Sequence, residues 1–221
     1  MKQATMKSVI LAGLMGATLL ASGATMAGIA MNIGATNNYI WRGVTQTNDL
    51  AAVSGGVDYT NDAGVYLGTW ASNLAGTQYE LDIYGGYTGT AGDISYDLGF
   101  IKYMYPVDDT VELDFLELKA TASFGPAMLY VAKTIQTEDS NADADSLYVA
   151  LSAKTEIEKD YIASVTIGSF TGDDIKAALG DEYKHYAVKL AKGEFSFAIE
   201  KNDLDGVLGD PRVVVSWVKS F

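Results

Sequence analysis

Residues 211–221, at the end of the chain, read PRVVVSWVKSF. Successive side chains of a β-strand point to opposite faces of a sheet, so every second residue shares a face. Counting back by twos, one face carries Phe221, Lys219, Trp217, Val215 and Val213. This face is apolar except for Lys219, and a lysine near a bilayer edge can extend its charged end into water. The stretch is therefore typical of the strand that closes an outer-membrane β-barrel, with Phe221 as the signal for barrel-assembly machinery.

The same two-residue alternation recurs along the chain. In residues 146–154, Leu147, Val149 and Leu151 share one face, and Lys154 lies on the opposite face. Charged residues recur in this way opposite the apolar face, as in a sheet with two different environments. At about nine to twelve residues per segment, the pattern predicts twelve strands, at 32–43, 51–60, 64–72, 78–88, 93–104, 112–124, 127–136, 146–155, 161–169, 183–192, 194–201 and 211–221.

The connections separate a membrane barrel from a soluble β-sandwich, which the alternation alone also fits. Tight links lie at 61–63, 89–92, 125–126, 156–160 and 193, and notably longer links at 137–145, 170–182 and 202–210. Short and long links tend to alternate, as in an up-and-down barrel with periplasmic turns and external loops. We therefore predict an all-β fold, a transmembrane antiparallel up-and-down β-barrel of about 12 strands. An even strand number places both termini on the periplasmic side.

The first residues have the pattern of an export signal. Lys2 and Lys7 give the first residues a positive charge, as in the n-region of a signal peptide. Residues 8–24 carry no charge, and small residues follow up to Ala27. The stretch is short for a retained anchoring helix and lacks a basic stop-transfer cluster. We predict a cleavable signal peptide at residues 1–27 and an outer-membrane β-barrel at residues 28–221. The predicted location is the outer membrane of a Gram-negative bacterium.

Composition excludes several classes of function. The chain is rich in Tyr, Val, Thr and Gly, which favours strands, and it has 15 basic and 28 acidic residues, a net charge of −13. Without Lys2 and Lys7 the balance is 13 basic against 28 acidic residues, or −15. This acidity excludes nucleic acid as a main partner. The absence of cysteine excludes disulfides and thiolate metal sites.

The inward faces hold the candidate functional residues. Twelve closed strands give a backbone diameter of roughly 24 Å, which side chains reduce to a narrow channel or fill. Charges of both signs point inward and could line a selectivity filter or form ion pairs that plug the barrel. The candidates for the lumen and a functional patch are Arg42, Asp58, Trp70, Glu80, Asp82, Glu117, Lys119, His185 and Lys189. The alternation also places Lys154, Glu194 and Glu200 inward.

Aromatic residues gather near the predicted strand ends. Membrane barrels carry aromatic girdles at both interfaces with water, although aromatics are enriched in strands generally. We expect interface positions for Tyr39, Trp41, Tyr59, Tyr79, Tyr87 and Trp217.

Four motifs in the first third of the mature chain carry a family resemblance. They are YIWRGVTQ at 39–46, GGVDY at 55–59, GVYLGTWASN at 64–73 and ELDIYGGY at 80–87. With them the chain resembles the TorF-type porins of Proteobacteria, which implies an outer-membrane barrel and no particular substrate. Two interpretations of the motif residues Trp41, Arg42, Asp58, Trp70, Asn73, Glu80 and Asp82 stay open. They form a functional patch, or they lock the first strands together by Arg–carboxylate pairing and aromatic packing.

Catalytic and metal motifs are sparse. Nucleophilic catalysis needs a base, and the only histidine is His185, with no Gly-x-Ser-x-Gly motif to pair with it. Acidic loop residues such as Asp203 and Asp205 lack the complete pattern of a calcium loop. No phosphate-binding loop and no His or Cys metal spacing is present. We predict neither an enzyme nor a bound metal or cofactor.

The predicted function is passive passage of small solutes or ions through a porin or narrow channel. Outer-membrane lipids and lipopolysaccharide would surround it. The alternatives are a non-conducting structural or adhesive barrel and an outer-membrane lipid-modifying enzyme. The solute, the openness of the lumen and the oligomeric state stay open at this stage.

Overall fold

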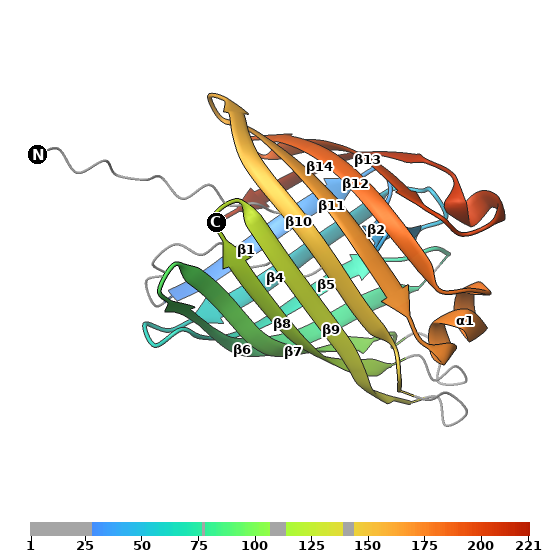
Figure 1. Ribbon diagram of the computed structural model, residues 1–221, viewed down its shortest axis with the longest axis horizontal. Coiled ribbons are helices and arrows are strands. Elements are labelled where there is room, and N and C mark those ends of the chain that lie inside the picture. The colour runs from blue at the N-terminus through green and yellow to red at the C-terminus, as the bar shows by residue number, and fades with distance from the viewer. Residues whose placement is uncertain (1–27, 77, 107–113, 139–143) are drawn as a thin grey trace, which may run out of the picture.

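The structure, a computed structural model, describes residues 28–76, 78–106, 114–138 and 144–221. Twelve antiparallel strands form a closed barrel in which each barrel strand pairs with the next barrel strand along the chain, and the last pairs with the first (Figure 1). The barrel strands are β1 (Gly28–Thr36), β4 (Ala52–Thr60), β5 (Val65–Asn73), β6 (Tyr79–Ala91), β7 (Ile94–Met104), β8 (Phe115–Phe124), β9 (Ala127–Thr137), β10 (Leu147–Glu158), β11 (Tyr161–Thr171), β12 (Tyr183–Lys192), β13 (Phe195–Asn202) and β14 (Arg212–Ser220). The predicted fold class is confirmed.

Pairing between β1 and β14 closes the barrel. Asn32 lies opposite Ser220, and Thr36 lies opposite Ser216. The backbone of Phe221 continues the closure by exchanging two hydrogen bonds with Met31. In the described part of the chain, closure gives every barrel strand a neighbour on both sides, which is the condition for a sheet to span hydrocarbon.

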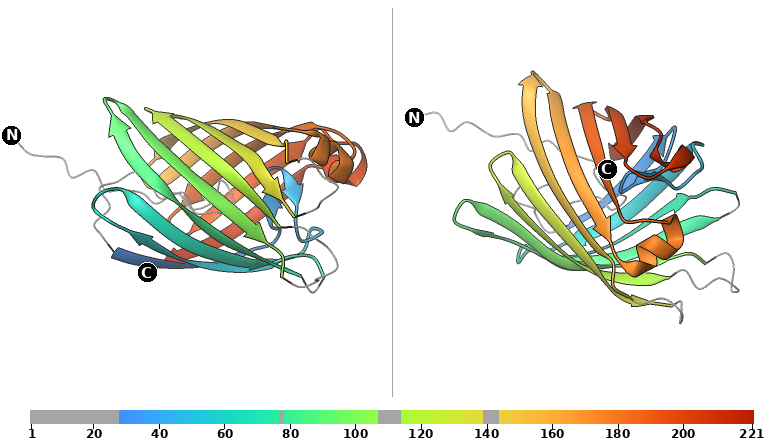
Figure 2. Two further views of the ribbon diagram at one scale, coloured as in Figure 1. Left: turned by 90° about the horizontal axis from the view of Figure 1, so that it is seen from below. Right: turned by 45° about the vertical axis from the view of Figure 1, so that its right-hand side comes forward.

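The two ends of the barrel differ. Short turns and both described chain ends, Gly28 and Phe221, lie at one end, here called the turn end (left in Figure 1). The longer connections lie at the opposite loop end, with the helix α1 (Asp173–Leu179) and the short helix η1 (Gly206–Gly209) (Figures 1 and 2). Among the described residues, neither helix has the length and apolar character to cross a membrane.

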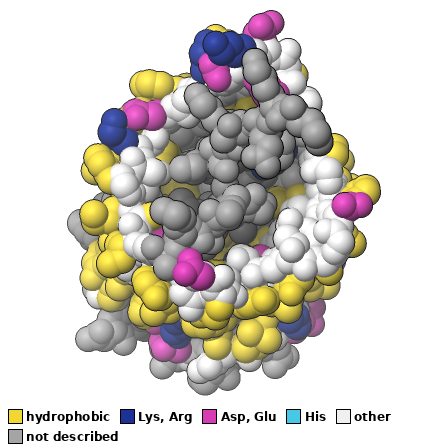
Figure 3. Space-filling model, turned by 90° about the vertical axis from the view of Figure 1, so that its left-hand side faces the viewer, with side chains coloured by type: hydrophobic (Ala, Val, Ile, Leu, Met, Phe, Trp, Pro, Cys, Tyr) yellow, Lys and Arg dark blue, Asp and Glu magenta, His cyan; other side chains and the backbone are white. Residues whose placement is uncertain are grey.

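The outer wall is apolar over its whole circumference. Large apolar side chains remain exposed on strand after strand, including Leu67, Leu98, Leu118, Leu151, Val165, Val188 and Val213. Figure 3, which looks onto the turn end, shows hydrophobic side chains around the rim of the barrel, with charged groups scattered among them. The alternating residues of the same strands point inward and are buried, as the alternation predicts.

The predicted first strand, 32–43, is wrong in both bounds. β1 ends at Thr36, and the following residues form a small hairpin of β2 (Ile40–Trp41) and β3 (Val44–Thr45) instead of extending the barrel. Its turn requires left-handed backbone, with φ of 49° at Arg42 and 82° at Gly43. Glycine adopts this conformation without steric cost, which makes the turn possible here.

Candidate functional site

The β2–β3 hairpin lies inside the barrel at the loop end (Figures 1 and 2). We call residues 38–47 the inner hairpin. Tyr39 and Val44 are buried among aromatic side chains of the barrel wall, and Trp41 packs partly buried against Tyr103 and Phe170. The prediction that Tyr39 and Trp41 lie at the membrane interface is therefore wrong. The chain turns inward before these residues, so they never reach the outer face.

Arg42 ties the inner hairpin to the wall. Its two terminal nitrogens donate hydrogen bonds of 2.8 and 2.6 Å to the two carboxylate oxygens of Glu117 on β8. Both side chains are almost completely buried, with 1% and 0% exposure. The Tyr103 hydroxyl donates a further hydrogen bond of 3.3 Å to Glu117. Two parallel charge-assisted hydrogen bonds are the strongest pairing available to arginine.

Glu117 lies beside an irregularity in the sheet. The register between β8 and β9 shifts between Leu116 and Glu117. Such bulges redirect side chains and are common next to functional sites.

The Arg42 guanidinium is also enclosed by aromatic rings. Its central carbon lies 4.3 Å from the ring centroid of Trp41, 4.2 Å from that of Tyr148 and 4.6 Å from that of Phe170. Cation–π contacts gain strength where water is excluded. Tyr148 and Phe170 lie on β10 and β11, and their part in the site was not predicted because alternation identifies inward residues without their contacts.

His185 and Asn202 support the turn of the inner hairpin. The Asn202 side chain donates a hydrogen bond of 2.7 Å to the Gly43 carbonyl oxygen. A Cβ atom at position 43 would lie 2.4 Å from the Cβ of His185, so only glycine allows this close approach. The Nε2 atom of His185 is hydrogen-bonded to the Tyr148 hydroxyl at 2.7 Å. The single histidine thus packs directly against the turn of the hairpin and helps to hold it in place.

A second arginine fixes the outer part of the same loop. Arg212, at the start of β14, donates a hydrogen bond of 2.6 Å to Asp49 and binds the carbonyl oxygens of Val207, Leu208 and Asp210. The hydrogen bond from Arg212 lowers the pKa of Asp49 below its usual range. The loop between β1 and β4 is therefore held at two points, inside by Arg42 and outside by Asp49.

Buried acids surround the other flank of the inner hairpin. Tyr39 donates a hydrogen bond of 2.8 Å to Glu80, and Tyr84 donates one of 2.5 Å to Asp58. Asp82 is fully buried, and its carboxylate makes no hydrogen bond within the described part of the chain. Hydroxyl groups of inward tyrosines thus satisfy part of the acidic charge.

The structure places all the lumen candidates on the inner side of the wall. Eight are buried and Lys189 is half-buried; the set is Arg42, Asp58, Trp70, Glu80, Asp82, Glu117, Lys119, His185 and Lys189. Arg42 pairs with Glu117 rather than with an acid of the early motifs, and Lys119 pairs with Asp97 at 3.0 Å. Their role in selectivity stays a prediction.

One of the charges placed inward by alternation lies elsewhere. Glu194 sits in the exposed turn before β13, where its carboxylate accepts hydrogen bonds from Trp217 at 2.8 Å and Lys219 at 3.0 Å on the outer face. Lys154 lies opposite Ser164 of the cavity wall, so it shares the inner face, and it is exposed because β10 extends beyond its pairing with β9. Of the predicted interface aromatics, Tyr59, Tyr79 and Tyr87 are exposed and Trp217 is half-exposed, all on the outer face. Their membrane contact stays a prediction.

The interior has two unlike sides. Large side chains of β5 to β12 fill one side against the inner hairpin, among them Tyr66, Trp70, Tyr84, Tyr103, Tyr130, Tyr148, Phe170 and Tyr183. The facing wall, from β1 and β11 to β14, carries small side chains such as Gly34, Ser164, Ala187, Ser196, Ala198 and Ser216. This difference in side-chain size leaves room beside the hairpin.

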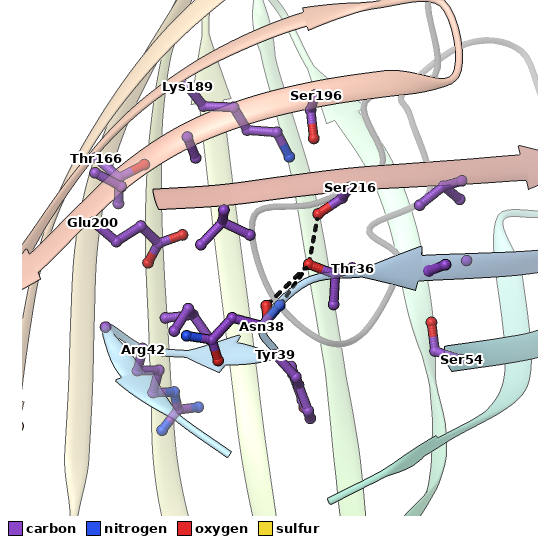
Figure 4. Close-up of a pocket in the computed structure, with 18 of the residues that line it drawn as sticks. Thr36, Asn38, Tyr39, Arg42, Ser54, Thr166, Lys189, Ser196, Glu200 and Ser216 are labelled. Atoms are coloured by element: carbon purple, nitrogen blue, oxygen red, sulfur yellow. Dashed lines mark hydrogen bonds between the residues drawn. The ribbon is translucent and has the colours of Figure 1, made fainter. Parts of the chain in front are cut away.

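A cavity of about 160 Å³ occupies that room (Figure 4). Its charged or titratable lining residues are Arg42, His185, Lys189 and Glu200. Figure 4 shows Lys189 and Glu200 extending into it from the barrel wall, above Thr36, Asn38 and Arg42. No group of three or more potential metal ligands occurs in the described ranges.

Comparison with the KdgM porin supports the fold. The KdgM porin superimposes with a TM-score of 0.57 at 11% sequence identity, covering 87% of this chain and 99% of the porin. The KdgM porin in complex with disordered oligogalacturonate gives a TM-score of 0.57 at 9% identity, covering 87% and 98%. The outer membrane protein OpdK from Pseudomonas aeruginosa gives a TM-score of 0.40 at 13% identity, covering 88% and 67%.

At these identities the likeness concerns the fold, and the chain is similar to a porin barrel. No curated protein matches the sequence significantly. A family model described as "Bacterial protein of unknown function (Gcw_chp)" matches residues 20–204. The chain therefore belongs to the Gcw_chp family.

Proposed function

We propose that this protein is a narrow, porin-like channel of the outer membrane, with a lumen divided by the inner hairpin. Small polar solutes pass along the wall formed by β1 and β11 to β14. The observation that carries the proposal is the cavity beside the hairpin, lined in part by hydroxyl and charged groups, inside a closed barrel with an apolar outer wall. A structural or adhesive barrel does not require a continuous small-residue wall.

The outer wall supports a membrane location. Exposed Leu, Val, Ile and Phe side chains on paired strands would be unfavourable in water and favourable against lipid tails. A signal peptide at 1–27, outside the described residues, remains part of the proposal, as do Phe221 as the assembly signal and lipopolysaccharide as a neighbour. The narrower assignment to the TorF-type porins also belongs to the proposal.

The environment of His185 supports a channel rather than a hydrolase. Its Nε2 atom is hydrogen-bonded to the Tyr148 hydroxyl, and its ring stacks on the Tyr148 ring with centroids 5.8 Å apart. A general base must instead reach a nucleophile in contact with substrate. We infer that His185 positions the inner hairpin.

Ion conductance in planar bilayers tests the proposal. We expect the purified, folded protein to give small, discrete conductance steps. Ser196→Trp places a large ring in the cavity and should reduce the step size several-fold. The neighbouring Phe197→Trp changes an exposed outer residue and should leave the step size unchanged. A silent bilayer with folded protein would overturn the proposal.

A further inference from the structure

Besides Arg42, which pairs with Glu117, the cavity is lined by one basic and one acidic residue, Lys189 and Glu200, and by several hydroxyl groups. We propose that it recognises small zwitterions, solutes with one ammonium and one carboxylate group. This inference rests on the proposed channel function and assigns its solute class. Lys189 would face the carboxylate of the solute, and Glu200 would face its ammonium group.

The two charged residues occupy neighbouring inward positions. In the pairing of β12 with β13, Lys189 lies opposite Ala198 and Glu200 lies opposite Ala187. All four residues line the cavity, and the two alanines leave the space in front of the charges open. Lys189 and Glu200 are therefore diagonal neighbours, close enough for one small molecule to contact both.

The two arginines near the cavity bind groups outside it. Arg42 binds Glu117 through both terminal nitrogens. Arg212, directly opposite Glu200 in the register of β13 with β14, binds Asp49 and three carbonyl oxygens of its own loop. Arg212, the arginine nearest to Glu200 in the sheet, therefore forms its hydrogen bonds with Asp49 and the loop, and Glu200 faces the cavity.

Hydroxyl groups complete the wall. Thr36, Ser54, Ser164, Thr166, Ser196 and Ser216 all line the cavity. Ser216 donates to Thr36 at 3.0 Å, and Thr166 is hydrogen-bonded to Ser152 at 2.9 Å. Hydroxyls can both donate and accept, so they can bind either end of a zwitterion or bridging water.

Charge and size narrow the solute class. A solute with a single charge is attracted by one of Lys189 and Glu200 and repelled by the other, whereas a zwitterion gains from both. An uncharged solute gains no Coulomb attraction from either charge. The volume of about 160 Å³ is close to that of an engineered cavity of about 150 Å³ that binds benzene, so it suits a solute as small as an amino acid.

Liposome swelling with two solutes of equal size tests the inference. Alanine is a zwitterion, and lactamide has the same number of heavy atoms without charge. We expect alanine to enter about five-fold faster than lactamide, a difference of about 1 kcal/mol. Lys189→Gln and Glu200→Gln should each bring the ratio close to one. The exchanged pair Lys189→Glu with Glu200→Lys should keep the preference, because both charges remain in the cavity.

The control is Lys184→Gln, on the exposed side of β12, which should leave the ratio unchanged. Equal entry of alanine and lactamide into wild-type liposomes would overturn the inference and leave the channel standing. An alanine preference that survives Lys189→Gln and Glu200→Gln would also overturn it. Exclusion of both solutes would refute the channel itself.

Discussion

Arg42→Ala is expected to release the inner hairpin and to increase the channel conductance several-fold. The substitution leaves Glu117 buried without its cation and removes the contacts of the guanidinium with Trp41, Tyr148 and Phe170. Removing one partner of a buried ion pair typically costs about 3–5 kcal/mol. Much of that cost can be relieved if the hairpin leaves the lumen and water reaches Glu117, so the channel should widen.

Single-channel recording and urea unfolding measure this effect. The matched control is Lys102→Ala, which removes partly exposed ion pairs with Asp114 and Glu138 and should cost about 1 kcal/mol or less. The double substitution Arg42→Met with Glu117→Leu leaves no buried charge and should recover much of the stability. An unchanged conductance in Arg42→Ala, with the protein folded, would show that the pair does not hold a constriction.

Val188→Lys is expected to destabilise the membrane-inserted barrel by about 2–4 kcal/mol, the cost of lysine on the lipid face at the bilayer midplane. Val188 lies in the middle of β12 and is 60% exposed on the outer wall. In hydrocarbon the ammonium group of the introduced lysine would have neither water nor a partner. Folding yield in lipid vesicles and the urea midpoint should both fall.

The adjacent residue provides the control for that experiment. Ala187 faces the cavity, opposite Glu200 in the register of β12 with β13. A lysine there has water and a carboxylate nearby, so Ala187→Lys should insert normally and alter ion selectivity instead. Equal stability losses in the two variants would contradict the assignment of the outer face to lipid.

Alternation was sufficient to predict most of the barrel. Every predicted strand after the first has bounds within three residues of the observed strand. The reason is physical: one face of each strand is apolar and the other polar, and a shift by one residue would exchange them. The inward position of Lys189 and Glu200 follows from the same rule.

The first strand and the site could not be predicted in this way. Residues 39–45 also alternate, and nothing local shows that their apolar side chains pack inside the barrel rather than against lipid. The pairing of Arg42 with Glu117 joins residues 75 positions apart, and its geometry exists only after the barrel has closed. The cavity depends on the difference in side-chain size between opposite walls, which no single strand contains.

Thiol labelling tests most directly whether the inner hairpin lies inside the barrel. The chain has no cysteine, so each introduced one is unique. Val44 is 6% exposed in the hairpin, whereas Val207, at the loop end, is 75% exposed. In the folded protein we expect a bulky maleimide to label Val207→Cys quickly and Val44→Cys far more slowly. Combining Val44→Cys with Arg42→Ala should make its labelling fast, because the hairpin is then released. Equally fast labelling of both single-cysteine proteins would contradict a hairpin held inside the lumen.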